Sequence, residues 1–135
     1  MMILRNYLIT FVCFMAVDLI WLGFVARAFY RNQIGFIMKS NPNWTAAIIF
    51  YLLYVVGILV FVIQPALGQQ SWRYALFAGF FFGFITYMTY DLTNLATLKD
   101  WPVMVTVVDI IWGTILGGAT SILSYSVINF LQQRS

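Results

Sequence analysis

Long hydrophobic stretches separated by short polar connectors dominate the pattern along the chain. We expect these stretches to form helices at about residues 7–29, 44–63, 72–98 and 102–131. About 20 consecutive apolar residues are enough to span the hydrocarbon core of a bilayer, so each stretch is long enough to cross it. The pattern therefore predicts an all-α fold, an integral membrane four-transmembrane-helix bundle that forms one domain over residues 1–135.

The connectors carry local signals of their own. Residues 30–43 mix polar and apolar side chains, which favours an interfacial segment, either a short amphipathic helix lying on the membrane or a lid over a site. Asn43 is suited to cap the second helix, because its side chain can accept a hydrogen bond from the first helical turn. Pro65 and Gly68 are expected to break that helix before a short polar turn.

The composition excludes a soluble globular domain. Hydrophobic residues make up 63% of the chain and charged residues 8%, with a mean hydropathy of +0.91. A soluble domain carries about 25% charged residues, and this chain has too few to cover a globular surface. The lipid bilayer is therefore its first predicted partner.

The net charge of +3 does not indicate nucleic-acid binding, because the basic residues are scattered near the predicted helix ends. Contact with lipid head groups explains them there. Three basic residues lie on the side of the termini and four on the opposite side, so the positive-inside rule does not orient the chain. A homodimer, including one of two oppositely inserted copies, stays open.

Several kinds of catalytic site are excluded by residue type. The chain has no histidine and no glutamate, which rules out zinc sites built on histidine and Ser-His-Asp triads. The single cysteine, Cys13, lies in an apolar run and reads as a small buried hydrophobe. We predict no cofactor and no dedicated metal ligands, and leave a bound cation open.

Three of the four aspartates lie inside predicted spans. Asp91 and Asp109 are each nine residues from Asp100 in the connector, so a rise of about 1.5 Å per residue puts both about 13 Å from that end. Asp18 lies nine residues before Arg27, which gives it a similar depth. An ionisable group at membrane depth costs about 2.5 kcal/mol or more and usually faces a cavity or the bundle interior. The three carboxylates are therefore the candidate functional site.

Aromatic and amide side chains accompany these acids. One face of the third helix carries a phenol, a carboxylate and an amide at positions i, i+4 and i+7, and a tryptophan follows three residues after two of the aspartates. Like charges in a low-dielectric site cannot all ionise without a proton, a cation or hydrogen-bond donors. The predicted ligand-binding or proton-coupling site comprises Asp18, Asp91, Asp109, Asn94, Tyr87, Tyr90, Trp21 and Trp112.

Two further patterns concern helix pairing. Residues 17–21 and 108–112 share the pattern V-D-[LI]-I-W in helices expected to run in opposite directions, as in inverted repeats. Gly79 and Gly83 form a GxxxG pattern that favours close helix packing, and Gly113 and Gly117 lie on a stripe of small residues that indicates an interface or a cavity wall.

Three classes of function remain open. The leading hypothesis is a protein that binds or translocates a small cationic or amphipathic ligand, with proton coupling as an option, since aromatic rings suit an ammonium group. The alternative is a membrane-embedded enzyme acting on lipids or isoprenoids, which ranks lower because aspartate-rich metal-binding repeats are missing. The second alternative is a non-catalytic accessory subunit. Catalytic residues and the identity of the small-molecule or lipid ligand are not assigned.

Residues 90–102 and 108–113 closely resemble a bacterial membrane family labelled domain of unknown function 2177, and residues 18–23 are similar to its first-helix signature. The resemblance covers nearly the whole chain. It implies a small, multi-pass, four-helix protein of the bacterial inner (cytoplasmic) membrane. It carries no established activity.

Overall fold

The computed structural model describes residues 2–134, of which helices form nearly all. No strand occurs in this part of the chain. Four helical segments are long and apolar enough to cross a membrane: Met2–Ile37, Trp44–Gln69, Trp72–Thr97 and Val103–Arg134. The predicted all-α membrane fold with four spans is thus confirmed.

The first span is longer than predicted. It consists of α1 (Met2–Trp21), a π-helical turn η1 (Leu22–Ala26), α2 (Arg27–Ile34) and a 3₁₀ turn η2 (Gly35–Ile37). Residues 30–37, expected to belong to a segment separate from the first helix, instead continue that helix. The physical reason is that α2 contacts the fourth span, where the Tyr30 hydroxyl donates to Asp109. The interfacial position of residues 30–37 stays a prediction.

The second span also continues further than predicted. It consists of α3 (Trp44–Ile58), a π-helical turn η3 (Leu59–Ile63) and α4 (Gln64–Gln69). The Asn43 side chain accepts a hydrogen bond from the backbone N–H of Ala46 at 3.1 Å, which confirms the predicted cap.

The expectation that Pro65 and Gly68 end this helix is wrong. Pro65 lies in the first turn of α4, directly after the π-helical turn, where a missing N–H is tolerated because the regular α-helical ladder is already interrupted. The helix ends at Gln70, whose φ of 51° places it in the left-handed region. Two backbone hydrogen bonds around this residue then close the turn.

The third and fourth spans, α5 (Trp72–Thr97) and α6 (Val103–Arg134), form a tightly packed hairpin. Gly83 faces Gly113, and Gly79 faces Gly117 across the interface. A methyl group on Gly117 would lie 2.9 Å from the Cα of Gly83, so only glycine fits at this crossing. The predicted packing role of these small residues is confirmed.

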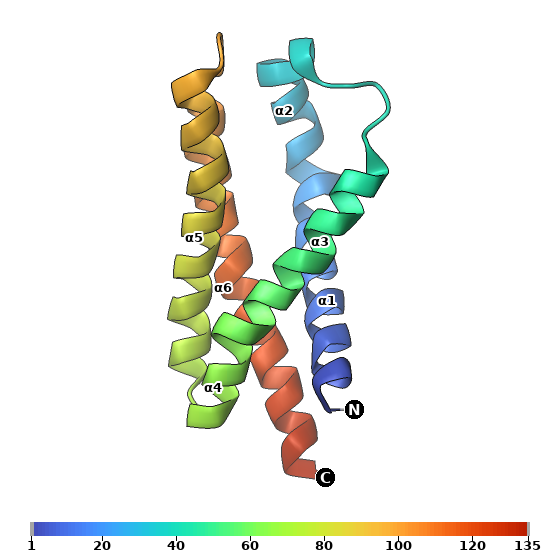
Figure 1. Cartoon of the computed structure of the whole chain (residues 1–135), viewed down its shortest axis with the longest axis vertical. Helices are drawn as coiled ribbons and strands as arrows, with labels where there is room; N and C mark the ends of the chain where they lie inside the picture. Colours follow the sequence, from blue (N-terminus) through green and yellow to red (C-terminus); the bar gives the residue numbers. More distant parts are fainter. Residues whose placement is uncertain (1, 135) are drawn as a thin grey trace.

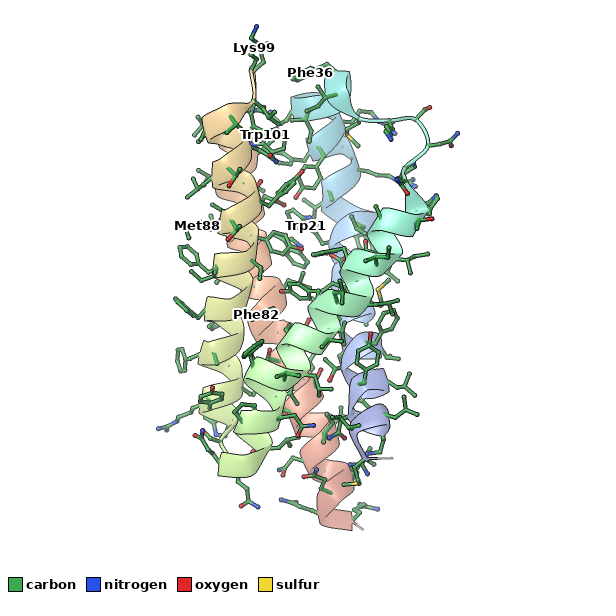
Figure 2. The ribbon with its side chains drawn as sticks, in the orientation of Figure 1. Trp21, Phe36, Phe82, Met88, Lys99 and Trp101 are labelled. Atoms are coloured by element: carbon green, nitrogen blue, oxygen red, sulfur yellow. The ribbon has the colours of Figure 1, made fainter. Side chains whose placement is uncertain are left out.

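Figure 1 shows how the spans are arranged. The first span, α5 and α6 run along the long axis of the molecule, while α3 crosses them diagonally. Both termini lie at one end, and the α5–α6 turn and α2 lie at the other. The side chains drawn in Figure 2 fill the space between the ribbons.

The two halves of the bundle differ in packing. The main hydrophobic core joins α1, the second span and α6, with Phe14, Ile58, Leu116 and Ile128 fully buried. Helix α5 packs extensively against α6 and makes smaller contacts with η3 and α4. The other half, between α2, the start of α3, α5 and the start of α6, contains the candidate site.

Candidate functional site

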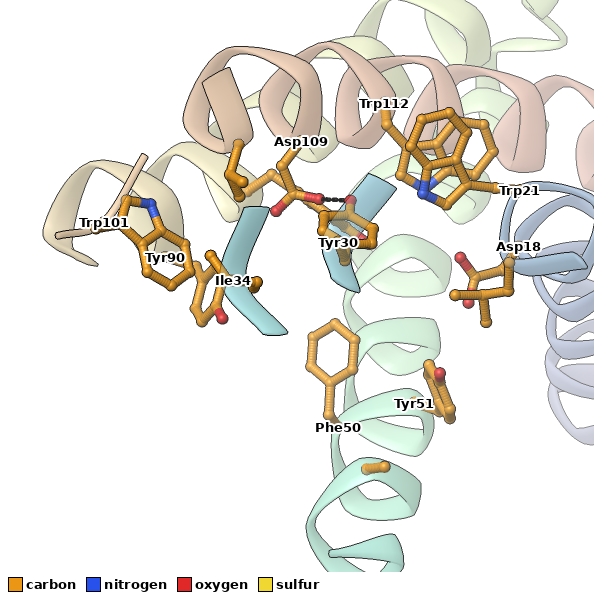
Figure 3. A pocket seen from close by; sticks show the side chains of 14 residues that line it. Asp18, Trp21, Tyr30, Ile34, Phe50, Tyr51, Tyr90, Trp101, Asp109 and Trp112 are labelled. Carbon is orange, nitrogen blue, oxygen red and sulfur yellow. Dashed lines mark hydrogen bonds between the residues drawn. The ribbon is translucent and has the colours of Figure 1, made fainter. Parts of the chain in front are cut away.

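A cavity of about 270 Å³ lies between all four spans. Its wall is formed mainly by aromatic rings, together with the carboxyl groups of Asp18 and Asp109. Of the predicted site residues, six line it: Asp18, Trp21, Tyr87, Tyr90, Asp109 and Trp112. The close-up in Figure 3 shows five of them, all except Tyr87, arranged around the ring of Tyr30.

Asp109 forms the centre of the cavity wall. It comes from α6 and is 8% exposed. The hydroxyl group of Tyr30, on α2, donates a short hydrogen bond to its Oδ1 atom (Figure 3). This contact ties the end of the first span to the fourth span, across the cavity.

Asp91 lies behind Asp109 and does not itself line the cavity. It is fully buried on α5, and neither of its carboxylate oxygens has a hydrogen-bond partner among residues 2–134. Its carboxyl group lies close enough to that of Asp109 for the two charges to interact. Two like-charged groups in such a site cannot both stay ionised unless a cation or a proton compensates them.

The backbone around Asp91 is held by the α5–α6 turn. The indole N–H of Trp101 donates to the Thr106 hydroxyl at 3.1 Å, and that hydroxyl donates to the Asp91 carbonyl oxygen at 3.5 Å. Trp101 is buried although it lies in the polar connector. This chain of hydrogen bonds fixes the end of α5 that carries the acid.

Asp18 occupies the other side of the cavity. It is 6% exposed, and the indole of Trp112 is among its near neighbours. Its interaction with Asp109 is through charge alone. The three aspartates are thus in one region, but the structure brings only Asp91 and Asp109 into a pair. Within residues 2–134, no three acidic or cysteine side chains gather where they could hold a metal ion.

The two copies of the V-D-[LI]-I-W pattern meet at this cavity. Their tryptophans, Trp21 and Trp112, stack with ring centroids 4.6 Å apart and planes at 8°. Trp112 is also a near neighbour of Asp18, and Trp21 is a near neighbour of Tyr30, whose hydroxyl donates to Asp109. The repeat therefore places the aspartate and the tryptophan of each copy at one cavity.

The remaining predicted residues on α5 have different positions. The Tyr87 side chain lies against Gly113, and the Tyr90 ring makes an edge-on contact with Trp101, with centroids 6.0 Å apart. Tyr90 is 55% exposed, so its ring forms part of the outer face of the bundle. Asn94 is half-buried near Tyr90 and does not line the cavity.

Sequence reasoning missed several lining residues: Tyr30, Ile34, Phe50, Tyr51 and Trp101. The first two lie beyond the π-helical turn η1, where positions counted at 3.6 residues per turn no longer predict the face. Tyr51 and Phe50 come from a span without charged residues, so nothing in its sequence indicated that it lines a site. Only Trp101 had a signal in the sequence, because a tryptophan is unusual within a polar connector.

Among the described residues, the cavity lining carries carboxyl groups and no basic group. Its lining contains two carboxyl groups and several phenol and indole rings, and it includes no lysine or arginine among the residues that the structure describes. Aromatic faces attract cations through the ring quadrupole. The arrangement suits an ammonium-type cation or a proton and disfavours an anion.

The comparisons with known proteins agree with the resemblance seen in the sequence. A search of curated proteins and a search of solved structures gave no match. Residues 3–126 match the family described as "Predicted membrane protein (DUF2177)". The match covers most of the chain, and it includes the aspartates, tryptophans and glycines that build the cavity and the α5–α6 hairpin. The chain belongs to this family of predicted membrane proteins.

Proposed function

We propose that this protein binds a small organic cation in the aromatic cavity, in exchange for a proton held by Asp91 and Asp109. One observation carries the proposal: a buried pair of carboxyl groups, of which Asp109 lines an aromatic cavity, has no basic partner among residues 2–134. Burying such a pair is costly unless a positive charge compensates it. A structural role alone would be filled at lower cost by neutral amides.

The exchange follows from charge balance. With no cation bound, the pair keeps one proton and a net charge of −1, because two adjacent carboxylates repel strongly at low dielectric. A cation bound beside Asp109 supplies the compensating charge, so the proton can leave. Proton and cation then compete for one pair, which is the condition for exchanging them across a membrane.

The aromatic rings supply the rest of the binding energy. Tyr90 stands on one side of Asp109, and the Trp21–Trp112 stack lies on the other (Figure 3). Tyr87 lines the same cavity. A cation over an aromatic face gains about 0.5–2 kcal/mol, with the larger value where water is excluded. A quaternary ammonium group, which cannot donate hydrogen bonds, is the simplest ligand that uses these faces.

The test is equilibrium binding of radiolabelled tetramethylammonium to the protein in lipid nanodiscs between pH 5 and pH 9. This probe keeps its charge at every pH, so any pH dependence comes from the protein. If one proton leaves per cation bound, affinity rises by about tenfold per pH unit while the pair is protonated. We expect Asp109→Asn to abolish binding and Asp91→Asn to remove the pH dependence.

The matched control is Asp100→Asn, which changes an aspartate in the α5–α6 turn. Its φ of 60° is one that asparagine tolerates well, so binding and its pH dependence are expected to match the parent. Absence of saturable binding to the parent would overturn the proposal. So would binding that is the same in the parent and in both carboxyl-pair variants.

A further inference from the structure

A second and a third cavity extend the site along one side of α5. The second, about 280 Å³, is lined by Phe50, Thr86, Tyr87, Tyr90 and Asp109, so it shares four of these residues with the first cavity. The third, about 290 Å³, shares Thr86 with the second and continues between α5 and η3. We call the second and third cavities together the α5 groove.

The α5 groove is almost entirely apolar beyond Asp109. The hydroxyl of Thr86 is bonded to carbonyl oxygens of its own helix, at 2.9 Å to Phe82 and 3.1 Å to Gly83. That leaves its methyl group for the groove. At the far end, the Tyr74 hydroxyl donates to the Phe61 carbonyl oxygen at 3.4 Å, which joins α5 to η3 there.

The groove opens sideways, towards where lipid chains lie. Phe50, Tyr90 and Phe61, which line it, are 46%, 55% and 67% exposed on the outer face of membrane-spanning helices. The diagonal course of α3 separates its first turns from α5 (Figure 1). From Tyr90 to Tyr74 the groove follows sixteen residues of α5, or about 24 Å at 1.5 Å per residue.

From this geometry we propose that the ligand is a single-chain amphiphile with an ammonium head and no phosphate, which reaches the site from the bilayer. The head occupies the aromatic cavity beside Asp109, and the hydrocarbon chain lies in the α5 groove. The inference rests on the proposed function and adds the class of ligand and the route. An apolar slot of this length beside a carboxyl group matches both ends of such a molecule.

The charges around the cavity argue against a phospholipid. Phosphate groups in proteins are bound by arginine, lysine or backbone N–H groups. The residues of 2–134 that line the first cavity and the α5 groove include no arginine or lysine. A phosphate beside the carboxyl pair would be repelled, whereas a simple ammonium head is attracted.

The test compares ligands that differ only in chain or head. Competition against radiolabelled tetramethylammonium in nanodiscs measures the affinity of decyltrimethylammonium and of decanol, with empty nanodiscs correcting for partition into lipid. Because each buried methylene group strengthens binding, we expect decyltrimethylammonium to bind at least about tenfold more tightly than tetramethylammonium. Decanol and added phosphatidylethanolamine are expected not to compete.

Ile85→Trp places a large ring in the α5 groove without touching the first cavity. It should remove the tenfold gain in affinity that the decyl chain provides, and leave tetramethylammonium binding unchanged. Phe77→Trp is the matched control, because Phe77 is 63% exposed on the same helix and lines none of these three cavities. It should behave as the parent.

The outcomes separate the two proposals. If tetramethylammonium binds but the decyl chain adds nothing, or Ile85→Trp keeps the full gain, the groove inference fails and the proposed function stands. Competition by phosphatidylethanolamine would also overturn the inference. If tetramethylammonium does not bind at all, or decanol competes as well as the charged ligand, the proposed function fails and the inference fails with it.

Discussion

Helix α5 has two neighbours, and its contacts with them differ in kind. Against α6, glycines let the two backbones touch, and a methyl group on Gly83 would collide with the Gly113 carbonyl. Against the second span, phenylalanine rings such as Phe82 hold the helices apart, and cavities lie on either side of Thr86. The glycine contact is short and has little freedom to adjust, whereas a contact through side chains can repack. The comparison indicates that α5 and α6 form a fixed unit, against which the second span can adjust.

The largest expected effect comes from disrupting the glycine contact between α5 and α6. Gly83→Leu puts a branched side chain where the α6 backbone lies, and overpacking of this kind costs about 3 kcal/mol. We expect a large loss of helical stability in detergent–SDS unfolding followed by circular dichroism. Gly68→Leu is the control, since a Cβ there meets nothing within 4 Å. Equal stability of the two variants would show that the glycine contact does not hold the hairpin.

The contact between α5 and the second span is tested by Phe82→Ala. This ring lies against Gly57, where an added Cβ would be 2.8 Å away, and packs edge-on against Tyr54 at 5.3 Å. Removing it should cost about 2 kcal/mol in the same unfolding assay, less than a large-to-small change in a fully buried core because repacking and lipid can fill the space. Phe81→Ala, at a position 66% exposed, should cost much less. If both changes cost the same, Phe82 is not the spacer between the spans.

The bond between Tyr30 and Asp109 is expected to contribute less. Tyr30→Phe removes the hydroxyl that donates to a buried carboxyl group, which should cost about 1.5 kcal/mol. Tyr7→Phe removes a hydroxyl bonded to the Leu52 carbonyl oxygen at an exposed site, and should cost less. Unfolding curves of the two variants, measured side by side, check this order. A larger loss for Tyr7→Phe would contradict it.

The smallest effect is expected at the α5–α6 turn. Trp101→Phe keeps the ring but removes the N–H that donates to Thr106, a change worth about 1 kcal/mol. Near-ultraviolet circular dichroism and unfolding in detergent measure it. Trp72→Phe, at a position 52% exposed, provides the control. A Trp101→Phe protein as stable as this control would show that the turn does not depend on the bond.

Much of the fold could be predicted because it follows from hydropathy and small-residue spacing. The four spans and the glycine contacts between Gly79, Gly83, Gly113 and Gly117 required only the period of the helix and the size of a side chain. The Asn43 cap followed from the first-turn donors that every helix leaves unpaired. These features are local or periodic, so the sequence carries them directly.

The candidate site was less predictable, because it depends on tertiary contacts. Equal depth along the helices placed the aspartates in one region, but it did not separate the buried pair from Asp18. Tyr30 could not be found by helical periodicity, and Pro65 did not end its helix. Both misses involve a π-helical turn, which interrupts the period on which such predictions depend.

The π-helical turn in the first span works as a phase shift within one continuous helix. Asp18 lies before it and Tyr30 after it, so the five residues Leu22–Ala26 set the rotation of one site residue relative to the other. If one of them were deleted and the turn became α-helical, the rotation of about 100° lost with that residue would be nearly offset by the tighter winding of the other four, so later positions would keep their face. The wider turn therefore absorbs one residue beyond the α-helical period between Asp18 and Tyr30, and both side chains still reach one cavity.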